Sequence, residues 1–272
     1  MKVYISADIE GVTGVAHDNQ TVSSSSEFQQ ARKWMTSDVN AAIDGALVSG
    51  AEEIYVKDAH SEGRNILLDD LRKEAYLISG WDTMISMVQG IDETFDALIL
   101  IGYHSMVYTR NGILAHTMSG CVKNLSLNDR PFGEPEISAL TAGHYGVPVI
   151  FIAGDQTAVS ELEGFVGKIP HAITKYGMGR ETGKLMHPEI TSKAITEGVS
   201  KGLSDLSRFK PFQIDLPITM SMKLSMPKMA DLIELVPDVR RISVDEVTYQ
   251  ADNVINMLRM FRVMLGLAWS LR

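Results

Sequence analysis

The chain has 272 residues, of which 45% are hydrophobic and 22% charged, and 34 acidic side chains against 25 basic ones give a formal net charge of −9. This balance is typical of a globular protein with a full core, in one domain or two small ones. The negative charge argues against a nucleic-acid partner, which would meet a basic surface. The single cysteine, Cys121, excludes a disulfide framework and a cysteine-rich zinc ribbon, and we expect it to be a small buried hydrophobe.

The N-terminal segment, MKVYISADIEG, is expected to form a strand and not a signal peptide, because it lacks a long apolar region before a small-residue cleavage site. No stretch approaches 18 uninterrupted apolar residues, so no transmembrane helix and no membrane partner are expected. We therefore predict a cytoplasmic protein.

Four short apolar runs end abruptly in acidic, histidine or glycine residues, and they cover residues 3–7, 54–56, 97–101 and 147–153. Runs of this kind suit strands that are covered on both faces, as in a parallel sheet. Residues 27–49 carry apolar side chains at helical spacing, and Gly50 stands where a glycine would end the helix. Strand, helix and strand in this order predict an α/β fold, a mostly parallel sheet flanked by helices, with a crevice where the strand order reverses.

The chain beyond residue 213 has a different pattern. The expected elements are a strand over 213–222, a helix over 227–235, a strand over 241–249 and a long amphipathic helix over 252–271. Proline and lysine residues around 208–211 mark a boundary. We therefore predict two domains, an α/β domain over 1–210 and a smaller C-terminal α+β subdomain over 211–272.

The carboxyl ends of three predicted strands carry residues of metal-ligand type: Asp8 and Glu10, then Asp58 and His60, then His104. In open α/β sheets, ligands bind outside the carboxyl ends of the strands. Residues i and i+2 of an extended segment face the same side, so Asp8 and Glu10 are able to face one ion together. Each residue alone is more often a helix cap or a loop residue, but three such strand ends together predict a metal or acid–base site.

Mixed carboxylate and imidazole donors suit Zn²⁺, Mn²⁺, Fe²⁺ or Co²⁺. Five candidate ligands exceed the three protein ligands of a single catalytic zinc ion, and a carboxylate that bridges two ions would explain the surplus. A two-metal site is able to bind both the attacking and the leaving atom of a hydrolysis. Familiar signatures of other enzymes, HExxH, GxSxG and the Walker A loop, are absent from the sequence.

Further candidates lie elsewhere in the sequence. His116, in LAHTMSG, is a candidate general acid or base. Glu134, in RPFGEPE, is expected on a loop that folds over the crevice, with Glu136 as its competitor. Asp155 is expected to cap a helix or to support the site. The remaining histidines are expected to be structural or solvated: His17, His144, His171 and His187.

Five segments, SADIEGVTG, VKDAHSEGRN, IGYHSM, LAHTMSG and NDRPFGE, resemble in order and at similar spacing the D-aminopeptidase family, the dinuclear zinc peptidases associated with dipeptide transport operons. The resemblance runs through residues 1–160 and continues more loosely to the end. It implies that Asp8 bridges two zinc ions per subunit, that Glu10 and His104 complete one site, and that His60 and Glu134 complete the other. It also implies that His116 is the catalytic histidine, as nucleophile or general base.

The resemblance further implies short peptide substrates with an N-terminal D-residue, such as D-Ala-D-Ala, and a ring-like homo-oligomer, a decamer. The 1–210 domain is then the metal-binding catalytic domain, and 211–272 serves oligomerisation or a substrate channel. Two departures from the family pattern are the Pro135–Glu136 pair after Glu134 and the serine-rich loop at 13–26. Three alternatives stay open: another metal-dependent amidohydrolase or phosphoesterase, an L-aminopeptidase, and a non-catalytic peptide-binding protein.

Overall fold

The computed structural model describes residues 1–81 and 86–272. Within these residues the larger sheet consists of β1 (Lys2–Ala7), β2 (Glu53–Asp58), β3 (Ala75–Ile78), β4 (Ala97–Tyr103), β7 (Val149–Asp155), β8 (His171–Gly177) and β9 (Gly183–Leu185). Its strand order is β3-β2-β1-β4-β7-β8-β9, and all neighbours are parallel except β9, which runs antiparallel to β8. The four predicted apolar runs are β1, β2, β4 and β7, which confirms the mostly parallel sheet.

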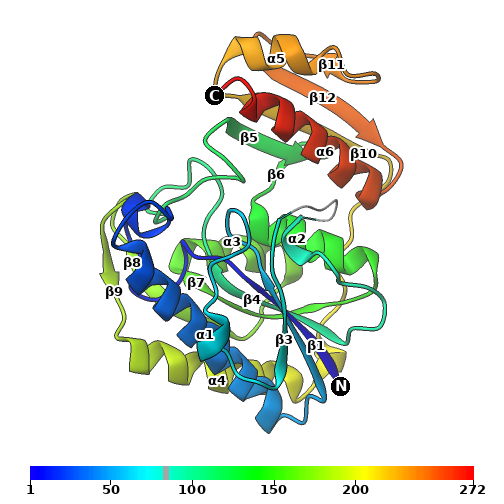
Figure 1. The fold of residues 1–272 in the computed structure, drawn as a ribbon. Helices are drawn as coiled ribbons and strands as arrows, with labels where there is room; N and C mark the ends of the chain where they lie inside the picture. The colour runs from blue at the N-terminus through cyan, green and yellow to red at the C-terminus, as the bar shows by residue number, and fades with distance from the viewer. Residues whose placement is uncertain (82–85) are drawn as a thin grey trace.

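Helices cover both faces of this sheet (Figure 1). One face is covered by α1 (Phe28–Val48) and α4 (Pro188–Leu203), and the other by α2 (Glu134–His144) and α3 (Gln156–Val166). Successive residues of a strand point to opposite faces, and β1 follows this rule, since Val3 and Ile5 pack with α1 while Tyr4 packs in the opposite core. The helix predicted over 27–49 is α1, which ends just before Gly50.

The strand order reverses beside β1. The chain passes from β1 outward to β2 and β3, then returns to β4 on the other side of β1 and continues to β7 and β8. The loops that follow β1 and β4 therefore diverge at their carboxyl ends and leave a crevice there. This is the predicted switch point, and the loops after β1, β2 and β4 carry the predicted ligands.

A smaller antiparallel sheet lies beyond the carboxyl ends of the larger one (Figure 1). Its order is β11-β12-β10-β5-β6, and it consists of β5 (Val122–Leu127), β6 (Arg130–Pro131), β10 (Ile218–Leu224), β11 (Arg240–Arg241) and β12 (Glu246–Ala251). Two helices, α5 (Pro227–Ile233) and α6 (Val254–Trp269), pack with it around a core of its own. Since β5 and β6 precede residue 210, this sheet is not built from 211–272 alone, and the division of the chain at 210 stays a prediction.

Two details differ from the sequence prediction. The strand predicted over 241–249 is a hairpin, because a turn held by Ile242 N and Ser243 N on Glu246 O separates β11 from β12. The strand predicted from 213 begins only after Pro217, which has no amide hydrogen for the ladder.

Short 3₁₀ helices complete the fold: η1 (Asp18–Gln20), η2 (Leu68–Asp70), η3 (Ser86–Val88) and η4 (Leu206–Arg208). Every helix among the described residues is too short or too polar to cross a bilayer.

Candidate metal centre

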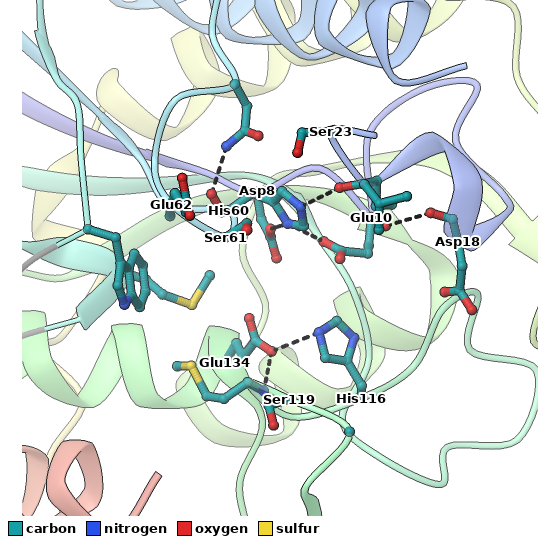
Figure 2. Close-up of a pocket in the computed structure, with 18 of the residues that line it drawn as sticks. Asp8, Glu10, Asp18, Ser23, His60, Ser61, Glu62, His116, Ser119 and Glu134 are labelled. Carbon is teal, nitrogen blue, oxygen red and sulfur yellow. Dashed lines mark hydrogen bonds and ion pairs between the residues drawn. The ribbon is translucent and has the colours of Figure 1, made fainter. Parts of the chain in front are cut away.

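A cavity of about 820 Å³ opens at the carboxyl ends of β1 and β2. Carboxylate and imidazole groups of the predicted site line it, and α6 contributes to its wall; these residues are Asp8, Glu10, His60, His116 and Glu134 with Arg262, Leu265 and Trp269. Figure 2 shows His60 beside Asp8 and Glu10, with Glu134 and His116 across the cavity. His104 is fully buried next to them.

Asp8 is held at the centre by the close approach of β1 and β4. Its amide donates to Ile101 O at 2.8 Å, and its Oδ1 accepts from Ile9 N at 2.8 Å. Gly102 makes this approach possible, because its φ is +71° and a Cβ atom there would lie 2.2 Å from Asp8 O. Only glycine adopts this conformation without strain. The backbone thus fixes the carboxylate between the loops that carry the histidines.

His60 is fixed by a turn that Asp58 organises. The Asp58 carboxylate accepts from Asn65 N at 2.5 Å and Ile66 N at 2.7 Å, so it holds the loop and does not face the cavity. His60 Nε2 lies 2.9 Å from Thr21 O, which places the ring hydrogen on Nε2. Its Nδ1 then turns a lone pair to Asp8 Oδ1 at 3.3 Å and Glu10 Oε2 at 3.2 Å.

His104 and His116 are oriented in the same way. Nδ1 of His104 donates to Ser105 O at 2.9 Å, and Nδ1 of His116 donates to Leu114 O at 2.8 Å. His104 Nε2 therefore faces Asp8 Oδ2 at 3.4 Å and Glu134 Oε1 at 3.3 Å. His116 Nε2 lies 3.6 Å from the same Glu134 oxygen, and the two imidazole rings stack with centroids 4.1 Å apart.

Glu134 is the first residue of α2, so its prediction as a loop residue is wrong. Gly133 caps the helix, Pro135 occupies its first turn, and Glu136 Oε2 accepts from Gly133 N at 2.9 Å. This arrangement starts the helix early. Glu136 is therefore used by its own helix, whereas Glu134 contacts both histidines across the cavity and accepts from Met118 N at 2.6 Å. Between the two predicted competitors, the contacts favour Glu134.

The donor atoms are arranged for a cation. Asp8 Oδ2, Glu10 Oε2 and His104 Nε2 are buried and have no hydrogen-bond partner. Donor atoms of Asp8, Glu10 and His104 lie within 4.8 Å of one another, as do those of His104, His116 and Glu134. Two ligands of a tetrahedral zinc ion lie ~3.3–3.6 Å apart when each is ~2.0–2.2 Å from the metal, and the histidine–carboxylate separations given above, 3.2 to 3.6 Å, are close to this range. Oxygen and imidazole donors without thiolate fit zinc.

The contacts also bear on the predicted division of the ligands between two ions. Asp8 faces both His60 and His104, as a bridging carboxylate would. The cluster of Asp8, Glu10 and His104 corresponds to one implied site. The shorter contacts of His60 are to Asp8 and Glu10, and Glu134 lies against His104 and His116, so the pairing of His60 with Glu134 at the second site stays a prediction.

Burial and mutual charge shift the pKa values of this cluster strongly. Burial, together with the charge of Glu10, raises the pKa of Asp8 to about 7. Burial disfavours a charged His60, but the interactions with the carboxylates of Glu10 and Asp8 together outweigh burial and raise the pKa of His60 well above its usual value. Burial likewise disfavours a charged His104, and the carboxylates around it, Glu134 above all, together raise its pKa well above the usual value. The acids and histidines therefore hold protons in a buried space, and a cation bound there would displace those protons.

The remaining predicted residues lie outside the cluster. Asp155 caps α3 by accepting from Thr157 N and Ala158 N, which confirms the helix-cap alternative. Each of the other histidines has a structural or exposed position: His17 and His187 cap η1 and α4, His171 lies beside Glu163, and His144 is exposed. Cys121 is buried among hydrophobic side chains, as predicted.

A model of the D-aminopeptidase family matches residues 1–263. A D-aminopeptidase of Bacillus subtilis (strain 168) is 33% identical over 270 residues, which cover 98% of each protein. The chain belongs to the D-aminopeptidase family. This membership confirms both the resemblance and the class of enzyme, a peptidase. The solved Zn-dependent D-aminopeptidase DppA from Bacillus subtilis, described as a self-compartmentalizing protease, has the same fold, with a TM-score of 0.96 and 32% identity over 99% of this chain and 98% of that one.

Two residues behind the site of this family member were not singled out from the sequence. Asp38 on α1 is buried and accepts from Thr13 N at 2.9 Å and from Thr13 Oγ1 at 3.1 Å, and burial raises its pKa to about 6. Lys175 on β8 is buried behind the same loop. Asp38 falls at helical spacing from the apolar residues Met35 and Ala42 of α1, and this position is the signal that would have marked it, whereas Lys175 lies in the polar sequence HAITKYG and has no such signal.

Proposed function

We propose that this protein is a zinc-dependent aminopeptidase that removes the N-terminal residue, of D configuration, from short peptides such as D-Ala-D-Ala. Two zinc ions per subunit would be held by the cluster described above, with Asp8 shared between them; the ligands are Asp8, Glu10, His60, His104 and Glu134. The proposal extends to this chain the zinc dependence of the DppA enzyme, with which it shares 32% identity over nearly its whole length.

One observation carries the proposal. Carboxylate and imidazole donors that follow three strands, together with one from the start of α2, converge at one cavity, and three of their atoms are buried without a hydrogen bond. An unpaired buried polar atom costs about 1–3 kcal/mol, so leaving several of them together has no benefit to the fold alone. The side chains are therefore arranged for a ligand, and their chemistry is that of a zinc site.

The residues of the chain divide the work around that site. When bound, zinc supplies Lewis acidity, which makes water a nucleophile near neutral pH. His116 keeps a lone pair on Nε2, because its Nδ1 hydrogen is committed to Leu114 O. Its side chain is 26% exposed at the cavity. His116 is thus placed to take a proton at Nε2 and to deliver it to the leaving amine, while Glu134 stabilises the imidazolium formed in between.

The cavity also bears on substrate size and assembly. A volume of about 820 Å³ accommodates a short peptide and not a folded chain. Its wall includes Arg262, Leu265 and Trp269 of α6, which supports a substrate-channel role for residues 211–272. The DppA enzyme is described as self-compartmentalizing, and we extend this to a large homo-oligomer, a decamer, for the present chain.

The proposal is tested by one panel of assays. Protein stripped with a chelator and protein restored with zinc are each given D-Ala-D-Ala, L-Ala-L-Ala and p-nitrophenyl phosphate. We expect zinc-dependent release of D-alanine from the first substrate alone. Peptide cleavage that survives the chelator rejects the metal mechanism. Preference for the L-peptide or the phosphate ester identifies an L-aminopeptidase or a phosphoesterase, and tight peptide binding without cleavage at saturating zinc identifies a binding protein.

A further inference from the structure

A buried lysine lies directly behind the loop that presents Glu10. Lys175 is fully buried on β8, and its Nζ donates to three backbone carbonyls of that loop. The acceptors are Glu10 O at 2.5 Å, Val12 O at 2.8 Å and Val15 O at 2.5 Å. An ammonium group has three N–H donors, so all of them are used on one short segment of chain.

The neighbouring residue on β8 acts on the same loop. Thr174 Oγ1 donates to Gly11 O at 2.6 Å. Four carbonyls of the segment 10–15 therefore point to β8 and are satisfied by side chains, although this segment has no regular secondary structure. Buried carbonyls without a partner are costly, so the conformation of the loop depends on these donors.

The position of Lys175 is not explained by an ion pair. Across residues 1–81 and 86–272 no carboxylate lies within salt-bridge distance of its Nζ. Burial lowers the pKa of Lys175 to about 7, and the charges of Asp155 and Asp38 oppose this only from further away. Burying an ammonium group costs several kcal/mol unless its surroundings compensate. A core that needed only packing would have an apolar side chain here. Lys175 Nζ instead donates hydrogen bonds to three carbonyls, and these bonds fix the backbone conformation of the loop.

We propose that Lys175 is a positioning residue of the metal centre, which fixes the loop at residues 10–15 so that the Glu10 carboxylate faces Asp8 and His104. Its bond to the carbonyl of Glu10 itself fixes the backbone from which that carboxylate projects. The inference deepens the proposed function and rests on it for the identity of the ion. It means that Lys175, which lies on the side of the loop away from the cavity, affects the zinc affinity of the metal position that uses Glu10.

The test compares two buried lysines. Lys175→Met keeps the length of the side chain and removes all three donors. Lys57→Met is the matched control, because Lys57 on β2 is also buried but bonds to Gly80 O, away from the 10–15 loop. Zinc affinity is measured by competition with a chromophoric chelator, and coordination by the visible spectrum of the Co²⁺-substituted protein.

We expect Lys175→Met to lose ~10–100-fold in affinity at one of the two metal positions, which is typical when an outer-shell partner is removed, and to change the Co²⁺ spectrum. Lys57→Met should keep both affinities and the wild-type spectrum, even if it unfolds more easily. If Lys175→Met also keeps both zinc affinities and the wild-type Co²⁺ spectrum, the inference is overturned and Lys175 is a structural lysine only.

A second variant covers the case in which Lys175→Met does not fold. Thr174→Val removes only the bond to Gly11 O and keeps the shape of the side chain, so we expect a smaller loss of zinc affinity in the same direction. Wild-type affinity and spectrum in Thr174→Val would then reject the inference. Neither readout involves a peptide, so a protein that binds zinc normally but cleaves no peptide rejects the proposed function and leaves the role of Lys175 standing.

Discussion

Replacing His116 by alanine separates proton transfer from metal binding. Glu134 Oε1 contacts both His116 and His104, and it also accepts from Met118 N at 2.6 Å. Removal of His116 therefore leaves Glu134 held by the backbone and by His104. We expect His116→Ala to keep the zinc content of the wild type, because every proposed ligand keeps contacts that do not involve His116.

The expected loss is in turnover. A positioned general acid or base contributes ~10²–10⁴ in rate, which corresponds to ~3–5 kcal/mol in the activation free energy. His116 is partly exposed and its ring stacks on His104 at 4.1 Å, so its removal uncovers one face of that ring and removes the donor to Leu114 O, a hydrogen bond worth ~0.5–1.5 kcal/mol. The change in kcat should accordingly far exceed the change in the free energy of unfolding.

The assay measures kcat and KM for D-Ala-D-Ala beside metal content by mass spectrometry and stability by urea unfolding. His144→Ala is the matched control, because His144 is exposed at the end of α2 and should change none of these quantities. A His116→Ala variant with two zinc ions and wild-type kcat would refute the assignment. Loss of zinc together with activity would instead make His116 a ligand, as its closeness to His104 and Glu134 permits.

Three further predictions concern the centre and its supports. Asp8→Asn should weaken zinc at both positions by more than the ~10–100-fold typical of an outer-shell change, measured by chelator competition. Burial raises the pKa of Asp38 from 3.8 to about 6, so the folded protein binds a proton at Asp38 more tightly than the unfolded chain does. The stability that this proton contributes at low pH should therefore be lost as the pH rises through about 6. That loss is ~3 kcal/mol or less in urea unfolding, and Asp38→Asn should abolish it. In Gly11→Ala the new Cβ would lie 1.9 Å from Tyr103 O, so unfolding should become easier by ~1–3 kcal/mol or more, whereas Gly266→Ala, with no atom within 4 Å on exposed α6, should gain ~0.5–1 kcal/mol.

The ligands at the strand ends were predictable because each is a charged or imidazole side chain shortly after an apolar run. One apolar run that ends in an acid or a histidine is a weak signal, but Asp8, His60 and His104 follow three such runs, and the three together predicted the site. The sheet rule then brings them together, since β2, β1 and β4 are neighbours. That part of the site needs only periodicity and the usual geometry of parallel sheets.

The predicted loop position of Glu134 is wrong, although the sequence contained the signal of a helix start. The sequence Gly133-Glu134-Pro135-Glu136 has a proline in the first turn and a glutamate three residues after the cap, which are marks of a helix start. When this segment is interpreted as a loop, Glu134 and Glu136 are equally good candidates for the metal ligand. Taken as a helix start, it assigns Glu136 to the cap and leaves Glu134 pointing into the cavity.

The smaller sheet was beyond local reading for a different reason. β5 pairs with β10, which follows it by some ninety residues, and both strands run antiparallel with bulges and short ladders. A strand of this length in the middle of a chain has no local feature that names its partner. The prediction of a subdomain over 211–272 therefore recognised β10, β12 and the helices but not the hairpin at 122–131 that completes their sheet.

How the proposed ligands would divide between two ions depends on which nitrogen each histidine presents, and this is set by the fold. His60 presents Nδ1 because Thr21 O takes its Nε2 hydrogen, whereas His104 presents Nε2 because the adjacent Ser105 O takes its Nδ1 hydrogen. Thr21 lies in a loop far from His60 in sequence, so no spacing rule connects them. Residue types at strand ends predict that a metal is bound, but the tautomers, and hence the geometry at each ion, follow only from where backbone carbonyls lie in the folded chain.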